Sequence, residues 1–243
     1  GTQGQHTVVG ALQFKQETYE SNFFTEERSR RQIGYVLDYR GFLTEALFVQ
    51  AGLRFDDNED FEDFLSFGAS ASYAFFSTGT TLRASIGRAQ TNPEFFQQFG
   101  FGGNFQGNPD LKPEQNFGFD IGVDQAVWGD RVILGATYFN ETLSDAIVGS
   151  GNTVDNADGE TDRQGVELAL TAMPLDGLTL TASYTYLDVE ADTDAGLVRR
   201  PEHTAALGAV YSFLGDRASV GVDVLLVSET QDFDFSAGSF PAP

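Results

Sequence analysis

The feature that most constrains this chain is an alternation of apolar and polar side chains that recurs almost from end to end. Residues 179–186 read Thr-Leu-Thr-Ala-Ser-Tyr-Thr-Tyr, so the larger side chains fall on one face and hydroxyl groups on the other. A period of two residues is typical of β-strands with one apolar face. About eleven such strands are predicted, at 7–16, 31–40, 45–55, 66–76, 80–88, 116–124, 131–140, 164–173, 179–186, 203–213 and 218–226.

The connections between these segments alternate between short and long. The short ones lie near 40–45, 76–80, 127–131, 174–178 and 213–217, and most carry the Gly, Pro, Asp and Ser residues of tight turns. The long ones lie near 16–30, 55–64, 88–116, 141–164, 187–202 and 228–243. In an antiparallel meander, alternate connections lie at opposite ends of the sheet. The pattern predicts one end of tight turns and one end of long loops, as in outer-membrane β-barrels.

Charge follows the same division. The six long segments contain 27 of the 36 acidic residues but only 7 of the 14 basic ones, so the acidity gathers at the loop end. The net charge of −22 excludes a nucleic-acid partner, because a phosphate backbone requires a basic surface. No apolar run approaches the roughly 20 residues of a membrane helix, whereas a membrane β-barrel spreads its apolar face over alternate residues.

Aromatic residues lie near the ends of the predicted strands, on the apolar face, where a membrane barrel carries its aromatic girdles. They are Tyr35, Tyr39, Phe55, Tyr73, Phe75, Tyr138, Tyr184, Tyr186, Tyr211 and Phe213. Ordinary core aromatics would give the same pattern. Single-chain bacterial barrels close with an even number of strands, so eleven strands predict that further strands lie outside this chain.

Six short segments carry more specific patterns. They are 52–56 (Gly-Leu-Arg-Phe-Asp), 92–99 (Asn-Pro-Glu-Phe-Phe-Gln-Gln-Phe), 107–114 (Gly-Asn-Pro-Asp-Leu-Lys-Pro-Glu), 164–167 (Gln-Gly-Val-Glu), 184–186 (Tyr-Thr-Tyr) and 199–201 (Arg-Arg-Pro). The third resembles the Gly-Asn-Pro-x-Leu-x-Pro-Glu signature of TonB-dependent outer-membrane receptors, and the others resemble signatures of that family in the same order. The resemblance covers nearly the whole chain.

This resemblance implies an all-β fold in which the antiparallel meander is part of a 22-stranded transmembrane barrel in the bacterial outer membrane. It implies active import of a scarce nutrient such as cobalamin or a ferric siderophore, with the order and spacing of motifs closest to the cobalamin and small-siderophore branch. The implied partners are outer-membrane lipid, the TonB complex and a plug domain. We expect residues 1–243 to be a partial barrel domain that lacks the plug and the C-terminal strands.

Three groups of residues are candidates for function. Aromatic residues on the long segment 88–116 are expected to contact ligand, together with one amide: Asn92, Phe95, Phe96, Phe99, Phe101 and Phe105. Motif residues are expected to be mainly structural: Asn108, Pro109, Leu111, Pro113, Glu114, Arg199, Arg200 and Pro201. Charged residues on the polar faces of strands are expected to face the lumen: Arg54, Arg83, Asp120, Asp124, Glu167 and Asp223.

Two further hypotheses concern metals and catalysis. Carboxylates at Asp56, Asp57 and Asp60 offer the oxygen ligands that calcium prefers, although their spacing is not that of an EF-hand and a solvated acidic rim is the favoured explanation. The chain has no cysteine and two histidines, and no Gly-x-Ser-x-Gly motif, so neither a cofactor nor an enzyme activity is expected.

The alternative to a receptor barrel is a soluble or surface-exposed β-sandwich that serves in adhesion or calcium binding. In a sandwich the apolar faces of two sheets pack against each other, and the alternation along each strand is the same. The two architectures differ in where the apolar face points, because only the membrane barrel turns it outward.

Overall fold

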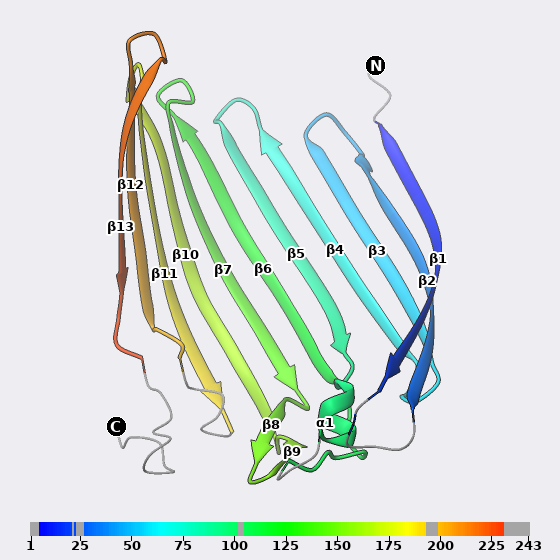
Figure 1. Ribbon diagram of the computed structural model, residues 1–243. Coiled ribbons are helices and arrows are strands. Elements are labelled where there is room, and N and C mark those ends of the chain that lie inside the picture. The colour runs from blue at the N-terminus through cyan, green and yellow to red at the C-terminus, as the bar shows by residue number, and fades with distance from the viewer. Residues whose placement is uncertain (1–4, 21, 23–26, 102–104, 193–198, 231–243) are drawn as a thin grey trace.

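The computed structural model describes residues 5–20, 22, 27–101, 105–192 and 199–230. Eleven antiparallel strands form one curved sheet whose order follows the sequence (Figure 1). They are β1 (His6–Tyr19), β2 (Arg28–Phe42), β3 (Leu47–Asn58), β4 (Phe64–Phe75), β5 (Thr80–Thr91), β6 (Glu114–Val127), β7 (Val132–Ser144), β10 (Glu160–Leu175), β11 (Leu178–Ala191), β12 (His203–Phe213) and β13 (Ala218–Val227). The predicted meander of eleven strands is therefore confirmed.

The two ends of the sheet differ as the connection lengths predict. Tight turns join strands at one end, drawn at the top of Figure 1, and the long connections lie at the other, hereafter the loop end. The turns at 128–130 and 214–216 each have a bulky residue, a glycine and an aspartate in succession, all at positive φ. Such backbone is favourable for glycine and tolerated by aspartate, which explains the Gly-Asp pairs.

Two of the long connections contain structure that the alternation does not predict. The segment after β5 forms a short helix, α1 (Phe95–Phe99), and the segment after β7 forms a hairpin of β8 (Ile147–Ser150) and β9 (Thr153–Asn156). The long connection predicted near 141–164 therefore contains a hairpin of its own. Strands of four residues are too short for a period of two to be distinguished from chance.

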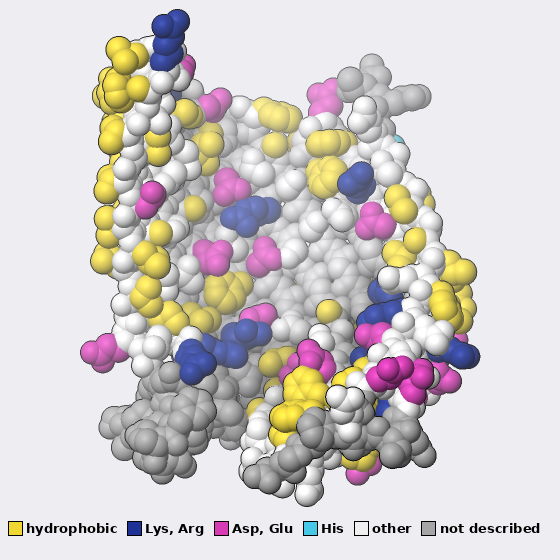
Figure 2. Space-filling view, viewed as in Figure 1, with side chains coloured by type: hydrophobic (Ala, Val, Ile, Leu, Met, Phe, Trp, Pro, Cys, Tyr) yellow, Lys and Arg dark blue, Asp and Glu magenta, His cyan; other side chains and the backbone are white. Residues whose placement is uncertain are grey.

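Register assigns every strand residue to one of two faces, because residues directly opposite each other point to the same side. Opposite pairs link Arg54 to Ser66, Arg83 to Gly122 and Glu167 to Thr137. Followed across the sheet, these pairs place all six residues predicted to face the lumen on the concave face. Figure 2 looks into this concave face, where acidic and basic side chains lie along the hollowed wall.

The convex face is apolar and exposed. Ile121 in the middle of β6 has 58% of its surface exposed, and Leu12 on β1 has 71%. Among the described residues, the buried hydrophobic side chains are Phe64, Leu111 and Ala172, together with Pro93. Register also places all ten aromatic residues predicted at the strand ends on this face. The sandwich alternative is wrong, since one sheet holds the long strands and nothing in the described chain packs on its apolar face.

The described residues contain no helix that is both long and apolar enough to cross a membrane.

Candidate functional site

Residues 92–101 lie across the loop end, where they reach β1 and β2 from the far side of β5. Arg30 fixes this crossing. Its Nη1 donates a hydrogen bond of 2.7 Å to the carbonyl oxygen of Pro93, and its Nε donates one of 2.8 Å to Glu17. The guanidinium also lies 4.5 Å from the ring centroid of Phe95, which stacks on Tyr19 at 5.6 Å. We call Glu17, Arg30, Pro93 and Phe95 the Arg30 anchor.

The predicted ligand-contact residues separate into two groups. Phe95 and Phe99 pack under arginines, since Arg28 lies 5.1 Å from the Phe99 ring. A second group consists of Phe96, Phe101 and Phe105, in which the last two stack at 5.0 Å and Phe96 lies 6.2 Å from Phe105. Phe101 remains 47% exposed and Phe96 37% exposed. We call these three residues the aromatic cluster, and it is the part of the loop that is free to contact a ligand.

The amide predicted beside these rings has a different setting. The side chain of Asn92 accepts a hydrogen bond of 3.0 Å from Gln90, at the end of β5. Asn92 therefore lies within the start of the crossing segment rather than in the aromatic cluster.

The motif at 107–114 is held against the β8–β9 hairpin. Asn108 donates hydrogen bonds to the carbonyl oxygen of Val154 and to Asp155, at 3.0 and 2.7 Å. Asn156 of β9 in turn bonds both the backbone N–H and the carbonyl of Lys112. Leu111 is buried, and Glu114 accepts a hydrogen bond of 2.8 Å from the backbone of Ile147. These contacts give Asn108, Leu111 and Glu114 a structural role.

Charged residues on the concave face are mostly paired. Arg54 lies 2.6 Å from Asp56, and Arg83 bonds Asp124 at 3.0 Å and Thr137 at 2.6 Å. Ser85 donates a hydrogen bond to Asp120. Glu167 and Asp223 lie on the same face by register, beside Thr137 and Gly208. Ion pairs of this kind lower the free-energy cost of partly burying charged side chains on the concave face.

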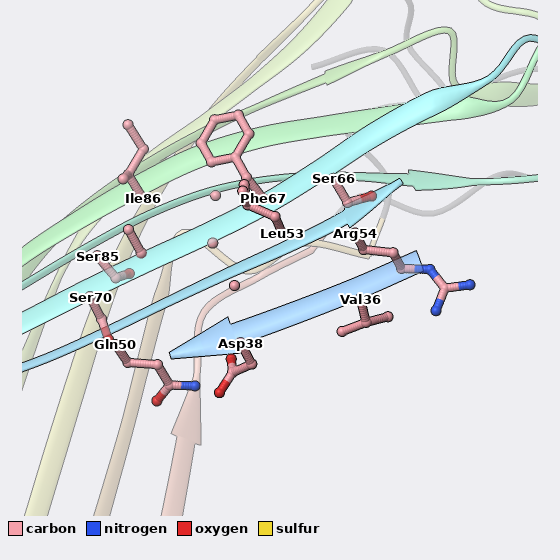
Figure 3. Close-up of a pocket in the computed structure, with 14 residues that line it drawn as sticks. Val36, Asp38, Gln50, Leu53, Arg54, Ser66, Phe67, Ser70, Ser85 and Ile86 are labelled. Atoms are coloured by element: carbon pink, nitrogen blue, oxygen red, sulfur yellow. The ribbon is translucent and has the colours of Figure 1, made fainter. Parts of the chain in front are cut away.

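A hollow lies in the concave wall beside Arg54. Four glycines occupy one row across β3 to β6, where Gly52 opposes Gly68, Gly68 opposes Gly87, and Gly87 opposes Gly118. The absence of side chains there leaves a cavity of about 510 Å³. In Figure 3, Phe67 and Ile86 lie on the opposite side of the ribbon from Asp38 and Gln50, so the hollow is polar on its open side.

Another charged pair on the concave face, Glu141 and Arg163, lies near the loop end of β7 and β10. Arg163 Nε lies 2.8 Å from Glu141 Oε1, although the N–H is not directed at that oxygen. Arg200 lies near both residues, and its Nη1 is buried without a hydrogen-bond partner. Burial lowers the pKa of Arg200, and the neighbouring charge of Arg163 lowers it further.

The geometry gives less support to the remaining candidate sites. Asp56 and Asp57 are consecutive strand residues and so point to opposite faces, and Asp56 already pairs with Arg54. The described residues contain no group of three carboxylates or imidazoles placed to hold a metal ion. The calcium hypothesis therefore receives no support from the structure. Pro109, Pro113 and Pro201 lie in non-strand segments that border the loop end.

Sequence reasoning did not identify Glu17, Arg30, Glu141, Arg163 or Asn156. Each acts through a partner on another strand or loop. The signal exists in the case of Glu17 and Arg30, which have opposite charge and stand directly opposite in the β1–β2 register. The position of the hairpin turn sets that register, and the alternation of side chains locates the turn only to within several residues.

Comparison with known proteins supplies the family. The model of the TonB-dependent receptor-like β-barrel matches residues 2–243. The siderophore receptor PirA from Pseudomonas aeruginosa superposes with a TM-score of 0.80 at 20% identity, over 93% of this chain and 43% of the receptor. A mutant of the ferric enterobactin receptor PfeA from the same organism gives 0.79 at 19% identity, over 95% and 40%. The copper transporter OprC gives 0.71 at 16%, over 91% and 42%.

The chain thus spans about two fifths of the length of the solved receptors that it matches. At these identities the solved structures show a shared fold and no more. The family model shows the kinship. Receptor barrels of this family are outer-membrane proteins, which accounts for an apolar convex face on which no described residue packs. The expectation of an outer-membrane location is confirmed, and the family is one of receptors and not of enzymes, as the resemblance implied. This chain belongs to the TonB-dependent receptor β-barrel family.

Proposed function

We propose that this chain forms part of the barrel of a receptor that imports a ferric siderophore across the outer membrane, energised by the TonB complex. The observation that carries the proposal is the aromatic cluster, which lies exposed at the loop end of a receptor barrel. Exposed rings offer a large contact area at a low entropic cost, which suits a bulky organic chelate. The two siderophore receptors that share its fold support the same cargo class.

The concave face has features of a surface against which another domain packs. Arg54 pairs with Asp56 and Arg83 with Asp124 within the wall, and the glycine row lies in a hollow of about 510 Å³. A plug domain would fit such a wall through backbone approach and hydrogen bonds. We include contact with a plug domain in the proposal.

The test is growth on single cargoes. The full-length reading frame is expressed in a bacterial strain that lacks its own siderophore receptors, under iron limitation, with one ferric siderophore supplied at a time. We expect one siderophore to restore growth. Phe101→Ala should raise the siderophore concentration required about tenfold, because it removes the most exposed ring of the cluster. Phe76→Ala, at the turn end and 73% exposed, is the matched control and should change nothing.

Copper is the second candidate cargo, because the loop end is strongly acidic and a copper transporter shares the fold. Cobalamin stays a prediction from the motif spacing, and none of the three transporters described above carries it in its name. The same strain, supplied with copper or cobalamin under the matching limitation, tests both. Growth restored by either, and by no ferric siderophore, would overturn the proposal.

A further inference from the structure

A shallow groove lies in the apolar convex face of the sheet. It has a volume of about 480 Å³ and crosses five strands that lie side by side in Figure 1, which are β6, β7, β10, β11 and β12. Its lining includes three half-buried alanines, Ala136, Ala182 and Ala205, and four large exposed residues, Leu134, Leu168, Tyr184 and Leu207. Register sets each alanine opposite one of the larger residues, so the alanines form the floor of the groove and the larger residues its rim. We call it the alanine groove.

The polar groups beside the alanine groove already have hydrogen-bond partners. Gln125 donates both amide hydrogens to backbone carbonyl oxygens, at 2.7 and 2.8 Å, and its oxygen accepts a hydrogen bond of 2.7 Å from Thr80. The hydroxyl of Tyr184 is paired with Nδ1 of His203 at 2.9 Å. Ser183 lines the groove with its backbone, because successive residues of a strand point to opposite faces. The groove therefore offers hydrocarbon to its ligand, and a polar ligand group placed there would be desolvated without compensation.

The depth of the alanine groove in the membrane follows from strand geometry. Trp128 lies in the β6–β7 turn and is 63% exposed, and it marks the periplasmic boundary because tryptophan is enriched at membrane–water interfaces. Along β6, Gln125 and Val123 lie three and five residues from Trp128. At a rise of about 3.4 Å per residue and a tilt of about 40°, these two positions lie about 8 and 13 Å below that boundary. One leaflet supplies about 15 Å of hydrocarbon, so the groove lies within the periplasmic leaflet.

We propose that the alanine groove binds an acyl chain of a phospholipid from the periplasmic leaflet, and holds it more tightly than the barrel holds its other lipids. The groove is continuous with the convex face that meets lipid, and an acyl chain is the apolar ligand present at this depth. A chain seated on the alanine floor contacts the rim residues on both sides, and these dispersion contacts are missing where lipid lies on a flat wall. The inference rests on the outer-membrane location of the barrel and is independent of the cargo.

The experiment titrates the full-length receptor in detergent micelles with a phosphatidylglycerol that carries a spin label on its acyl chain. Electron paramagnetic resonance measures the immobilised fraction of the label. We expect saturable binding that Ala182→Phe weakens about tenfold, because the phenyl ring occupies the space that the chain would fill. Ala84→Phe is the matched control and should leave binding unchanged. Ala84 is an exposed alanine of the convex face outside the groove, four residues from the turn-end start of β5, as Ala182 is in β11.

Circular dichroism checks that each variant is folded, and Ala136→Phe, on a different strand, decides if Ala182→Phe is not. Unlabelled phosphatidylglycerol should displace the label, whereas glycerol 3-phosphate, which has the headgroup phosphate without a chain, should not. Equal affinity in the wild type and the groove variants, or displacement by glycerol 3-phosphate, would overturn the inference. So would light scattering that shows a wild-type dimer and a monomeric Ala182→Phe with unchanged label binding, because a second copy would then occupy the groove. Cargo is absent from the titration, so its outcome and that of the growth test are independent.

Discussion

Arg30 has 9% of its surface exposed although it carries a full charge. Hydrogen bonds to Glu17 and to the carbonyl of Pro93, and the ring of Phe95, offset the cost of burying this charge. The same residue therefore decides both the local stability of β2 and the position of the segment that crosses the loop end. A single side chain here sets where the aromatic cluster lies.

Replacing Arg30 with alanine should release the crossing segment. The change leaves the Pro93 carbonyl without this donor and leaves Glu17 paired with Lys15 alone, at a cost of about 2 kcal/mol after allowance for the partial exposure of Glu17. We expect faster hydrogen–deuterium exchange across 93–100 and a lower melting temperature. Arg40→Ala removes an exposed arginine of the same strand and is the control. Equal exchange in both variants would show that Arg30 does not anchor the segment.

At the scale of elements, the β8–β9 hairpin acts as a brace for the motif at 107–114. Asn156 makes three hydrogen bonds, with the N–H and carbonyl of Lys112 and with the carbonyl of Asp145. Asn108 contributes two more from the motif side. A loop that would otherwise be long and costly to order is thereby divided into short, fixed pieces.

Asn156→Ala should loosen this brace without disturbing the sheet. Three lost hydrogen bonds, each worth about 1 kcal/mol in net terms, should raise the exchange rate of backbone amides between 108 and 113 by at least tenfold. Asn152→Ala is the matched control, because Asn152 contributes its backbone carbonyl to Gln106 and its side chain is exposed. Protection that persists in Asn156→Ala would assign the stability of the motif to packing around Leu111 instead.

The long strands could be predicted from the sequence and the loop elements could not, for one physical reason. A strand such as β11 repeats the alternation of apolar and polar residues over fourteen residues. The alternation is regular because all residues of one face meet the same surroundings. The helix at Phe95 and the hairpin at Ile147 depend on contacts between segments distant in sequence. Phe96 and Phe101 could be named as candidates because a long segment rich in aromatic residues is visible in the sequence, whereas Arg30 looks like any charged strand residue.

At the scale of the whole molecule, the two faces of the sheet meet different solvents. Neighbouring residues Leu168 and Ala169 on β10 point to the convex and concave faces, and both side chains are exposed. Their surroundings in the membrane-bound receptor differ, since the convex face meets lipid and the concave face meets the lumen. The apolar face that would aggregate in water is stable in the bilayer.

This difference predicts opposite outcomes for one substitution at adjacent positions. Leu168→Arg places a charge in lipid and should reduce the unfolding free energy of the full-length receptor in vesicles by about 2–4 kcal/mol if the position lies near the midplane. Ala169→Arg places it in the lumen and should cost less than about 1 kcal/mol. Urea titration of both variants measures the difference. Equal destabilisation would contradict the assignment of faces.

The acidic loop end also acts on the whole receptor, because it presents a long-range field to any approaching cargo. With 27 of the 36 acidic residues in the six segments predicted as long connections, which include the strand ends beside them, the field repels anions and attracts cations until salt screens it beyond about 10 Å. The sign of the salt effect on association therefore reports the charge of the cargo. For an anionic ferric chelate, we expect the association rate to rise severalfold between about 10 and 150 mM salt, because salt screens the repulsion. Stopped-flow quenching of receptor fluorescence measures the rate. A rate that falls with salt would indicate a cationic cargo and favour copper over a siderophore.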